Sequence, residues 1–269
     1  MKHVIDSIRY NVETYGDGFP VILLHGFTGD GTMWTPFYEK WGNHSKLFAV
    51  DIIGHGKSDS PEEVERYRML SVVDDLFLLM EKLRIPKADF IGYSMGGRLA
   101  LSFAVKYPTK VRKLVLESSS PGLEKETERQ ARIAQDLKLA SFIEQEGIEA
   151  FVNHWENIPL FETQKKLSDA VRRSMREQRL RNSIIGLSNS LKGMGTGAQP
   201  SWWDELETTE VDTLLITGAL DNKFCGIAQN MKEKLIHCQW VNVDDAGHAI
   251  HMEQPEIFGT IVSRFLSNT

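Results

Sequence analysis

The run Gly92-Tyr93-Ser94-Met95-Gly96 constrains the fold of this chain more than any other feature. An apolar stretch typical of a buried strand precedes it at residues 87–91, and a helix-forming stretch follows at residues 98–104. A G-x-S-x-G turn between a strand and a helix is a nucleophile elbow, which presents the serine hydroxyl above the edge of a sheet. The N-terminus of the following helix directs unpaired N–H groups to the same place. We therefore predict that Ser94 acts as a nucleophile or a base.

Composition excludes several classes of protein. The chain has 269 residues and a net charge of -6, with acidic and basic residues interspersed, so we expect no nucleic-acid partner. No stretch approaches the ~20 apolar residues of a membrane span, and the N-terminus lacks an apolar signal region. These features predict a cytoplasmic protein without a membrane partner, as a monomer or small homo-oligomer. Cys225 and Cys238 are expected to be buried free thiols.

Apolar runs alternate with amphipathic ones along most of the chain. Strands are predicted at residues 21–24, 46–53, 89–93, 111–117, 213–217 and 240–243, with a strand or hairpin at the sheet edge over residues 3–14. Helices are predicted at residues 71–83, 95–107, 226–235 and 255–266. Such alternation is typical of an α/β fold with a mostly parallel central sheet and helices on both faces.

One long segment departs from this pattern. Residues 123–206 contain no convincing buried strand and show charged amphipathic helices at 124–145 and 164–187. An insertion of this length is best interpreted as a helical cap over the active-site edge of the sheet. The predicted organisation is a core at 1–122, a cap at 123–206 and the rest of the core at 207–269. The loop at 193–203, with three glycines and two tryptophans, is either a turn followed by core aromatics or a lid hinge.

A serine hydroxyl needs a base and an acid, which follow the elbow in the order serine, acid, histidine. Asp221 and His248 each come just after a predicted strand, at the edge where open α/β sheets place their sites. Taken singly, Asp221 could be a helix N-cap and His248 a surface histidine. Asp244 and Asp245 also lie near His248 in the sequence, and we interpret them as turn residues. We predict a triad of Ser94, Asp221 and His248.

The same sheet edge is expected to bind developing negative charge. The loop that begins with His25 follows the strand at 21–24 and matches the loop that donates a second oxyanion N–H group. The backbone amides of Phe27 and Met95 are therefore the predicted oxyanion hole, and each donor can contribute ~3 kcal/mol to transition-state stabilisation. The glycine-rich turn at 51–58 lacks the spacing of a phosphate loop. With no clustered His/Cys spacing and no dinucleotide-type glycine motif, no metal and no cofactor are expected.

These motifs together resemble the α/β-hydrolase superfamily over nearly the whole chain. A closer resemblance is to the family of 2-succinyl-6-hydroxy-2,4-cyclohexadiene-1-carboxylate (SHCHC) synthases of menaquinone biosynthesis, which eliminate pyruvate from a 5-enolpyruvyl precursor. The segments that carry this resemblance are residues 92–98, 120–123, 131–132, 155–161, 193–203 and 221–224.

The SHCHC synthase resemblance implies a substrate with several carboxylates. Arg98, Arg132 and Lys223 stand at positions that match carboxylate-binding residues of that family, and an arginine fork can bind a carboxylate bidentately. Tyr93, Trp155 and His25 match further pocket positions. Glu156, which follows Trp155, stands where some relatives carry tyrosine. The resemblance therefore does not imply that this chain makes the hydrogen bond of that tyrosine.

Structural alternatives exist for these pocket residues. Arg98 could pair with a nearby acid, Arg132 and Lys223 could be solvated, and Tyr93 and Trp155 could be plain packing residues.

The hypothesis that follows is a lyase in which Ser94, assisted by His248, removes a proton from the substrate. The main alternative is a carboxylesterase or a carbon–carbon bond hydrolase that uses the same triad. A third hypothesis is that the protein is a non-catalytic small-molecule receptor. Haloalkane dehalogenases and epoxide hydrolases are disfavoured because they carry aspartate at the elbow.

Overall fold

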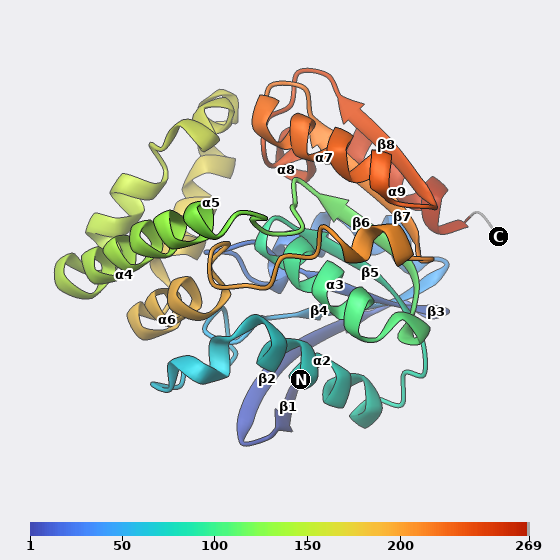
Figure 1. The fold of residues 1–269 in the computed structure, drawn as a ribbon, viewed down its shortest axis with the longest axis horizontal. Coiled ribbons are helices and arrows are strands. Elements are labelled where there is room, and N and C mark those ends of the chain that lie inside the picture. Colours follow the sequence, from blue (N-terminus) through green and yellow to red (C-terminus); the bar gives the residue numbers. More distant parts are fainter. Residues whose placement is uncertain (268–269) are drawn as a thin grey trace.

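The computed structural model describes residues 1–267, which are built around an eight-stranded sheet (Figure 1). The order of the strands in the sheet is β1-β2-β4-β3-β5-β6-β7-β8. Their bounds are β1 Lys2–Ile5, β2 Ile8–Tyr15, β3 Phe19–Leu24, β4 Ser45–Val50, β5 Ala88–Tyr93, β6 Val111–Glu117, β7 Asp212–Gly218 and β8 Cys238–Val243. Strand β2 is antiparallel to β1 and β4, and the remaining pairs are parallel. The mostly parallel sheet and the hairpin at its edge are therefore confirmed.

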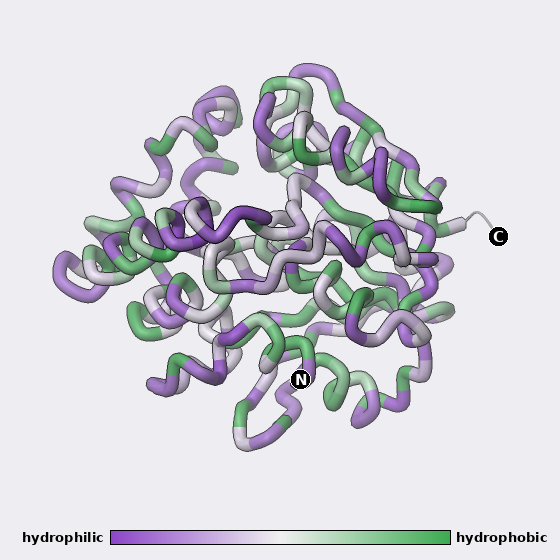
Figure 2. Tube along the Cα trace, in the orientation of Figure 1, coloured by the Kyte–Doolittle hydropathy of each residue, from purple (hydrophilic) through white to green (hydrophobic). Residues whose placement is uncertain are grey.

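Both faces of the sheet are covered, which explains why its central strands are apolar at successive positions. In β3, Ile22 and Leu24 face one hydrophobic core and Val21 and Leu23 face the other. The first core contains side chains of α2 (Met69–Lys82), α3 (Met95–Lys106) and α7 (Asn222–Lys234), and the second those of α1 (Tyr38–Gly42), α8 (Ile250–Glu253) and α9 (Pro255–Ser267). Figure 2 shows the hydrophobic stretches gathered in the strands and the helix faces against them. Short 3₁₀ helices connect these elements at η1 (Gly31–Phe37), η2 (Val64–Tyr67) and η3 (Pro108–Lys110).

Residues 118–211, between β6 and β7, are helical or irregular and add no strand to the sheet. They form α4 (Glu126–Trp155), η4 (Pro159–Lys166), α5 (Asp169–Leu180), α6 (Ile184–Met194) and η5 (Glu205–Thr208). We call residues 126–194 the cap segment; its helices lie together at one side of the sheet (Figure 1). It has a small hydrophobic core of its own, formed by Ala140, Ile143, Phe151, Val152, Leu187 and Leu191.

The helices of the cap segment differ from the prediction. The helix predicted at 164–187 is wrong as a single element, because the chain leaves α5 after Leu180 and restarts at α6, where the Ser183 hydroxyl caps the new N-terminus by accepting the Gly186 N–H at 3.1 Å. The helix predicted at 124–145 continues to Trp155 across a kink at Gly147, where φ is +81°. Helices η1 and α1 were not among the predicted elements.

The glycine-rich loop after α6 is tied to the core by its two tryptophans. The indole N–H of Trp202 donates to Ser102 Oγ at 2.8 Å, and that of Trp203 donates to the Gly122 carbonyl at 3.1 Å. Both rings pack partly buried against the core, as a turn followed by core aromatics would. A hinge motion of this loop stays a prediction.

The two cysteines form no disulfide, as predicted, but the expectation that they are buried is wrong. Cys225 and Cys238 are half-buried, because one lies in the first turns of α7 and the other opens the edge strand β8. No helix of residues 1–267 combines the length and the apolar character needed to cross a membrane.

Candidate active site

The turn at Ser94 has the strained geometry of an elbow. Ser94 has φ +50° and ψ -107°, a conformation that costs a non-glycine residue roughly 1–3 kcal/mol. Its N–H group donates to the Glu117 carbonyl at 2.8 Å, which ties the turn to β6. The flanking glycines are required by space: a Cβ atom on Gly92 would lie 2.4 Å from the Gly96 carbonyl oxygen, and one on Gly96 would lie 2.3 Å from that of Leu24. The serine hydroxyl therefore stands at the carboxyl edge of the sheet.

Three loops at this edge bring the predicted triad residues into contact. His248 Nε2 lies 3.0 Å from Ser94 Oγ, and His248 Nδ1 lies 2.7 Å from Asp221 Oδ2. When Nδ1–H donates to the carboxylate, Nε2 is left to accept the serine proton. His248 is 2% exposed and Asp221 is 8% exposed. The arrangement is that of a serine activated by a general base.

Asp221 is also the N-cap of a helix. Its Oδ1 accepts the Phe224 N–H at 3.3 Å, so the same carboxylate caps α7. Asp244 and Asp245 are exposed, and Asp245 adopts φ +56°, as expected for turn residues.

Aromatic rings surround the imidazole. The ring centroids of Phe224, Tyr93 and Phe161 lie 4.6, 5.5 and 6.2 Å from that of His248. Burial and the nearby Glu117 carboxylate raise the pKa of the Tyr93 phenol well above its usual value, so Tyr93 stays neutral. These contacts hold the imidazole plane between Ser94 and Asp221.

The backbone amides of Phe27 and Met95, the predicted oxyanion donors, belong to residues of the cavity. Both residues line the cavity that contains Ser94, and neither amide donates a hydrogen bond to another group of residues 1–267. The Met95 amide is at the N-terminus of α3, where N–H groups have no partner within the helix.

His25 has a structural environment, and the expectation that its side chain lines the substrate pocket is wrong. The ring is fully buried, Nδ1–H donates to the Gly26 carbonyl at 2.8 Å, and Nε2 accepts the Ile52 N–H at 2.9 Å. Burial lowers the pKa of His25, which keeps the ring neutral. Its hydrogen bonds fix the loop that carries the Phe27 amide.

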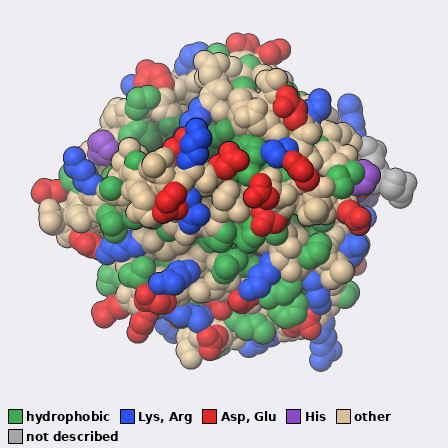
Figure 3. Space-filling view, in the orientation of Figure 1, with side chains coloured by type: hydrophobic (Ala, Val, Ile, Leu, Met, Phe, Trp, Pro, Cys, Tyr) green, Lys and Arg blue, Asp and Glu red, His purple; other side chains and the backbone are tan. Residues whose placement is uncertain are grey.

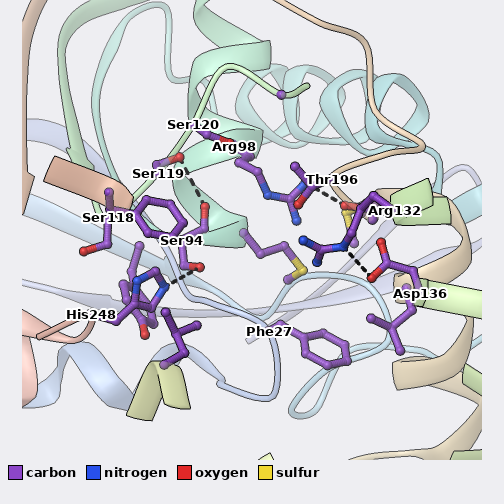
Figure 4. A pocket seen from close by; sticks show the side chains of 18 of the residues that line it. Phe27, Ser94, Arg98, Ser118, Ser119, Ser120, Arg132, Asp136, Thr196 and His248 are labelled. Carbon is purple, nitrogen blue, oxygen red and sulfur yellow. Dashed lines mark hydrogen bonds and ion pairs between the residues drawn. The ribbon is translucent and has the colours of Figure 1, made fainter. Parts of the chain in front are cut away.

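A cavity of about 200 Å³ extends from the triad to two arginines. Figure 4 shows Ser94 and His248 at one side of the cavity and Arg98 and Arg132 at the other, with Phe27 below Arg132 in this view. Arg98 comes from α3, one turn beyond Ser94, whereas Arg132 comes from α4 of the cap segment. The core and the cap segment thus each contribute one guanidinium to the cavity.

The two guanidinium groups have different partners. Arg98 Nη1 donates to the Met194 carbonyl at 2.7 Å and to Gln199 Oε1, both of them neutral groups. Burial and the positive charge of Arg132 lower the pKa of Arg98 to about 9. Arg132 Nε donates to Asp136 Oδ1 at 2.8 Å. Arg98 is therefore not paired with an acid, and Arg132 is not simply solvated.

Asp136 binds Arg132 through only one of its carboxylate oxygens. Its Oδ1 is bound by Arg132, whereas its Oδ2 is buried without a hydrogen-bond partner, and burial raises the pKa of the carboxyl group. The cavity end thus combines two guanidinium groups with a single, partly satisfied carboxylate.

The remaining predicted residues differ in position. Lys223 is exposed, lines the cavity and lies 5.5 Å from the centroid of the Phe224 ring. The Trp155 ring also lines the cavity, and its Nε1 is buried without a hydrogen-bond partner. Glu156 turns away to accept a hydrogen bond from Arg176 at 2.7 Å.

Sequence reasoning missed several groups near the triad. Ser118, Ser119 and Ser120 line the cavity, and Ser119 Oγ donates to the Ser94 carbonyl at 3.3 Å. They directly follow an apolar strand, so the rule that sites lie at carboxyl ends of strands could have identified them. Asp136 could have been found from its i+4 spacing to Arg132.

No three His, Cys, Asp or Glu side chains among residues 1–267 gather closely enough to hold a metal ion.

Comparisons with known proteins agree with this geometry. The family model described as alpha/beta hydrolase fold matches residues 20–255. A Bacillus subtilis protein is 48% identical over 267 residues, which are 98% of this chain and 97% of that protein. That protein carries the provisional name of an SHCHC synthase. The structure of MenH from S. aureus superimposes with a TM-score of 0.91 at 31% identity, over 95% of this chain and 97% of that one.

Esterases are also similar in structure. A malate-bound esterase from Thermogutta terrifontis has a TM-score of 0.87 at 27% identity, over 99% of this chain and 97% of that one. The family model covers most of the chain, and the sheet order and the Ser94, His248 and Asp221 contacts are consistent with it. The chain therefore belongs to the α/β-hydrolase fold family.

Proposed function

We propose that the protein is a cytoplasmic SHCHC synthase of menaquinone biosynthesis, a carbon–oxygen lyase that eliminates pyruvate from a 5-enolpyruvyl precursor. The observation that carries the proposal is the pairing of a triad with two guanidinium groups in one cavity. The hydrogen bonds of Arg98 go to neutral oxygens alone, and a half-buried cation of this kind favours an anionic ligand. The names of the B. subtilis relative and of MenH support the same activity.

The proposed reaction begins with proton transfer. His248 Nε2 accepts the proton of Ser94 Oγ, and the resulting alkoxide removes an acidic C–H proton from the substrate. The electron pair of the C–H bond moves toward a conjugated carbonyl oxygen, which the Phe27 and Met95 amides stabilise. As this charge returns, a carbon–carbon double bond forms and the C–O bond to the enolpyruvyl group breaks. The leaving enolate becomes pyruvate when it takes up the proton held by His248, which returns the imidazole to its neutral form. Because Ser94 carries only a proton, no acyl-enzyme is formed.

The cations orient the substrate for this step. In the proposal, Arg98 and Arg132 each bind a carboxylate, and Lys223 adds positive charge at the rim of the cavity. Tyr93 and Trp155 provide apolar walls. A fixed orientation matters because proton removal and departure of the leaving group require the C–H and C–O bonds to be aligned at Ser94.

A pyruvate-release assay tests the proposal. Wild-type protein and the 5-enolpyruvyl precursor should yield pyruvate and SHCHC in equal amounts, detected with lactate dehydrogenase and by absorbance of the diene. Ser94→Ala should lower kcat by at least about 10³-fold, as loss of a triad serine does in hydrolases. Ser141→Ala, at an exposed serine of α4, is the matched control and should retain wild-type activity.

A carboxylesterase is the second candidate, favoured by the similarity to the esterase from T. terrifontis. Rapid hydrolysis of p-nitrophenyl esters with no pyruvate above background would establish that activity and reject the lyase. An absence of turnover with either substrate, unchanged by Ser94→Ala, would instead indicate a receptor.

A further inference from the structure

Two further cavities adjoin the active-site cavity. One, of about 250 Å³, lies between the Phe27 loop and α5, and the other, of about 400 Å³, lies between η4 and α5. We call the latter the outer basic cavity; its basic lining residues are Lys165, Arg172, Arg173, Arg176 and Arg179. Phe161 contributes to the walls of all three cavities.

The lining of these cavities is far more basic than the chain as a whole. Nine lysine and arginine residues line the three cavities, against two carboxylates, Asp136 and Glu156. The whole chain has the opposite balance, with 31 basic and 37 acidic residues. On the face seen in Figure 3, acidic and basic side chains are interspersed. The cations of the cavities therefore form a local region of positive potential on an acidic protein.

Two arginines of the outer basic cavity lack an acidic partner. Arg173 is exposed and forms no ion pair with any residue from 1 to 267. Arg179, which is 8% exposed, donates to the neutral Gln164 Oε1 at 3.1 Å, and burial lowers its pKa. Arg172 and Arg176 are held by Asp169 at 2.5 Å and Glu156 at 2.7 Å. The cavity thus contains uncompensated positive charge, a suitable environment for carboxylates.

Phe161 connects this cavity to the triad. Its ring centroid lies 5.3 Å from the guanidinium carbon of Arg179 and 6.2 Å from the His248 ring centroid. One side chain, 6% exposed, therefore lies between the inner end of the outer basic cavity and the catalytic imidazole. An anion bound on α5 would be adjacent to the active-site cavity.

We infer that the outer basic cavity is a capture site for small polycarboxylates, where the substrate binds before it reaches Arg98 and Arg132. This inference rests on the proposed function for the identity of the substrate. Positive potential at a cavity raises the rate of encounter with an anion, and the effect decreases as salt screens it. The capture site contributes to association and not to the chemical step.

The test removes two charges from α5. R172Q/R173Q should lower kcat/KM for the 5-enolpyruvyl precursor about five- to ten-fold at about 0.01 M salt and leave kcat unchanged. At about 1 M salt, where the Debye length is roughly 3 Å, the variant and the wild type should become equal. K46Q/K87Q is the matched control, since it removes two exposed charges near the starts of β4 and β5, at the opposite edge of the sheet. It should retain the wild-type kcat/KM at both salt concentrations.

Two results would overturn the capture site. One is an equal kcat/KM for R172Q/R173Q and wild type at low salt, and the other is an equal loss in K46Q/K87Q. Binding of citrate, followed by calorimetry, tests the site even if no pyruvate is released and the proposed function fails. R172Q/R173Q should then weaken citrate binding at low salt, and unchanged binding would reject the inference.

Discussion

Arg98 lies one helical turn beyond Ser94, and this spacing brings the serine hydroxyl and a guanidinium group into one cavity. The contacts of Ser94 with His248 and of His248 with Asp221 are compatible with hydrolysis and with elimination. In the proposed function, the guanidinium of Arg98 distinguishes the two, because an esterase for neutral acyl chains has no use for a cation there. In the proposed function, the residue that selects the substrate is thus adjacent to the triad and not part of it.

Replacement of Arg98 tests this distinction. We expect Arg98→Ala to lower kcat/KM for the 5-enolpyruvyl precursor about 10- to 150-fold, since a hydrogen bond to a charged group contributes roughly 1.5–3 kcal/mol. Arg98→Lys keeps the charge without the planar fork, so its kcat/KM should lie between those of Arg98→Ala and the wild type. Steady-state pyruvate release measures both, with thermal unfolding as the control for folding. Unchanged kinetics in Arg98→Ala would show that this cation does not bind the substrate.

The triad residues could be found from sequence because each follows a strand whose apolar pattern is strong. Side-chain orientation could not be found in this way. His25 is adjacent to a predicted oxyanion donor, yet its ring points into the protein and bonds the backbone. Glu156 similarly follows a cavity residue, but a helical chain turns successive side chains in different directions, so it faces Arg176.

Among the elements, α4 shows how a helix of the cap segment is shaped. It runs from Glu126 to Trp155 and kinks at Gly147, so that Arg132 and Trp155, from its two parts, line the same cavity. At the kink, Gly147 has φ +81°, and a Cβ atom added to this residue would meet nothing within 4 Å. The need for glycine is therefore conformational and not steric.

A pair of glycine substitutions isolates this conformational effect. Gly147→Ala should lower the free energy of unfolding by about 1–2 kcal/mol, because alanine is strained at positive φ. Gly226→Ala, in α7, also meets no atom within 4 Å but has no positive φ, so it should raise stability by roughly 0.5–1 kcal/mol. Urea unfolding of the two variants provides the measurement. Equal effects of the two substitutions would contradict the assignment of strain to Gly147.

Over the whole molecule, the sheet was predictable and the cap segment less so. The central strands of the sheet are buried on both faces. Runs such as Val21 to Leu24 are therefore apolar at every position, and this pattern can be recognised without knowing the neighbouring elements. The helices of the cap segment are half-exposed and bury narrow faces against one another, and their breaks depend on local capping such as that by Ser183. Three cations of the cavity lining, Arg98, Arg132 and Lys223, were predicted from the family resemblance. The arginines that α5 adds were not, because α3, α4 and α5 contribute to the lining from distant positions in the sequence.

The whole molecule is also sensitive to acid through two buried histidines. His55, which is 1% exposed, has its pKa lowered to about 3 by burial and by His25, whose own pKa is lowered by burial. The unfolded chain binds these protons near pH 6.5, so stability is lost as the pH falls below that value. His55 alone should reduce the free energy of unfolding by about 2 kcal/mol between pH 7 and pH 5.

Urea unfolding at both pH values measures this loss. His55→Gln should show a smaller decrease than wild type, whatever its stability at pH 7. His44→Gln, at an exposed histidine, should keep the wild-type decrease. A decrease in His55→Gln as large as that of the wild type would place the acid sensitivity elsewhere.

Asp221 joins two structures through one carboxylate, since one oxygen caps α7 and the other orients His248. Surface loops usually accept insertions and deletions, but the link between β7 and α7 has no such freedom. A change of one residue in its length would rotate Lys223 and Phe224 on the helix and withdraw the carboxylate from the imidazole. The length of this connection is thus as fixed as the identity of the aspartate within it.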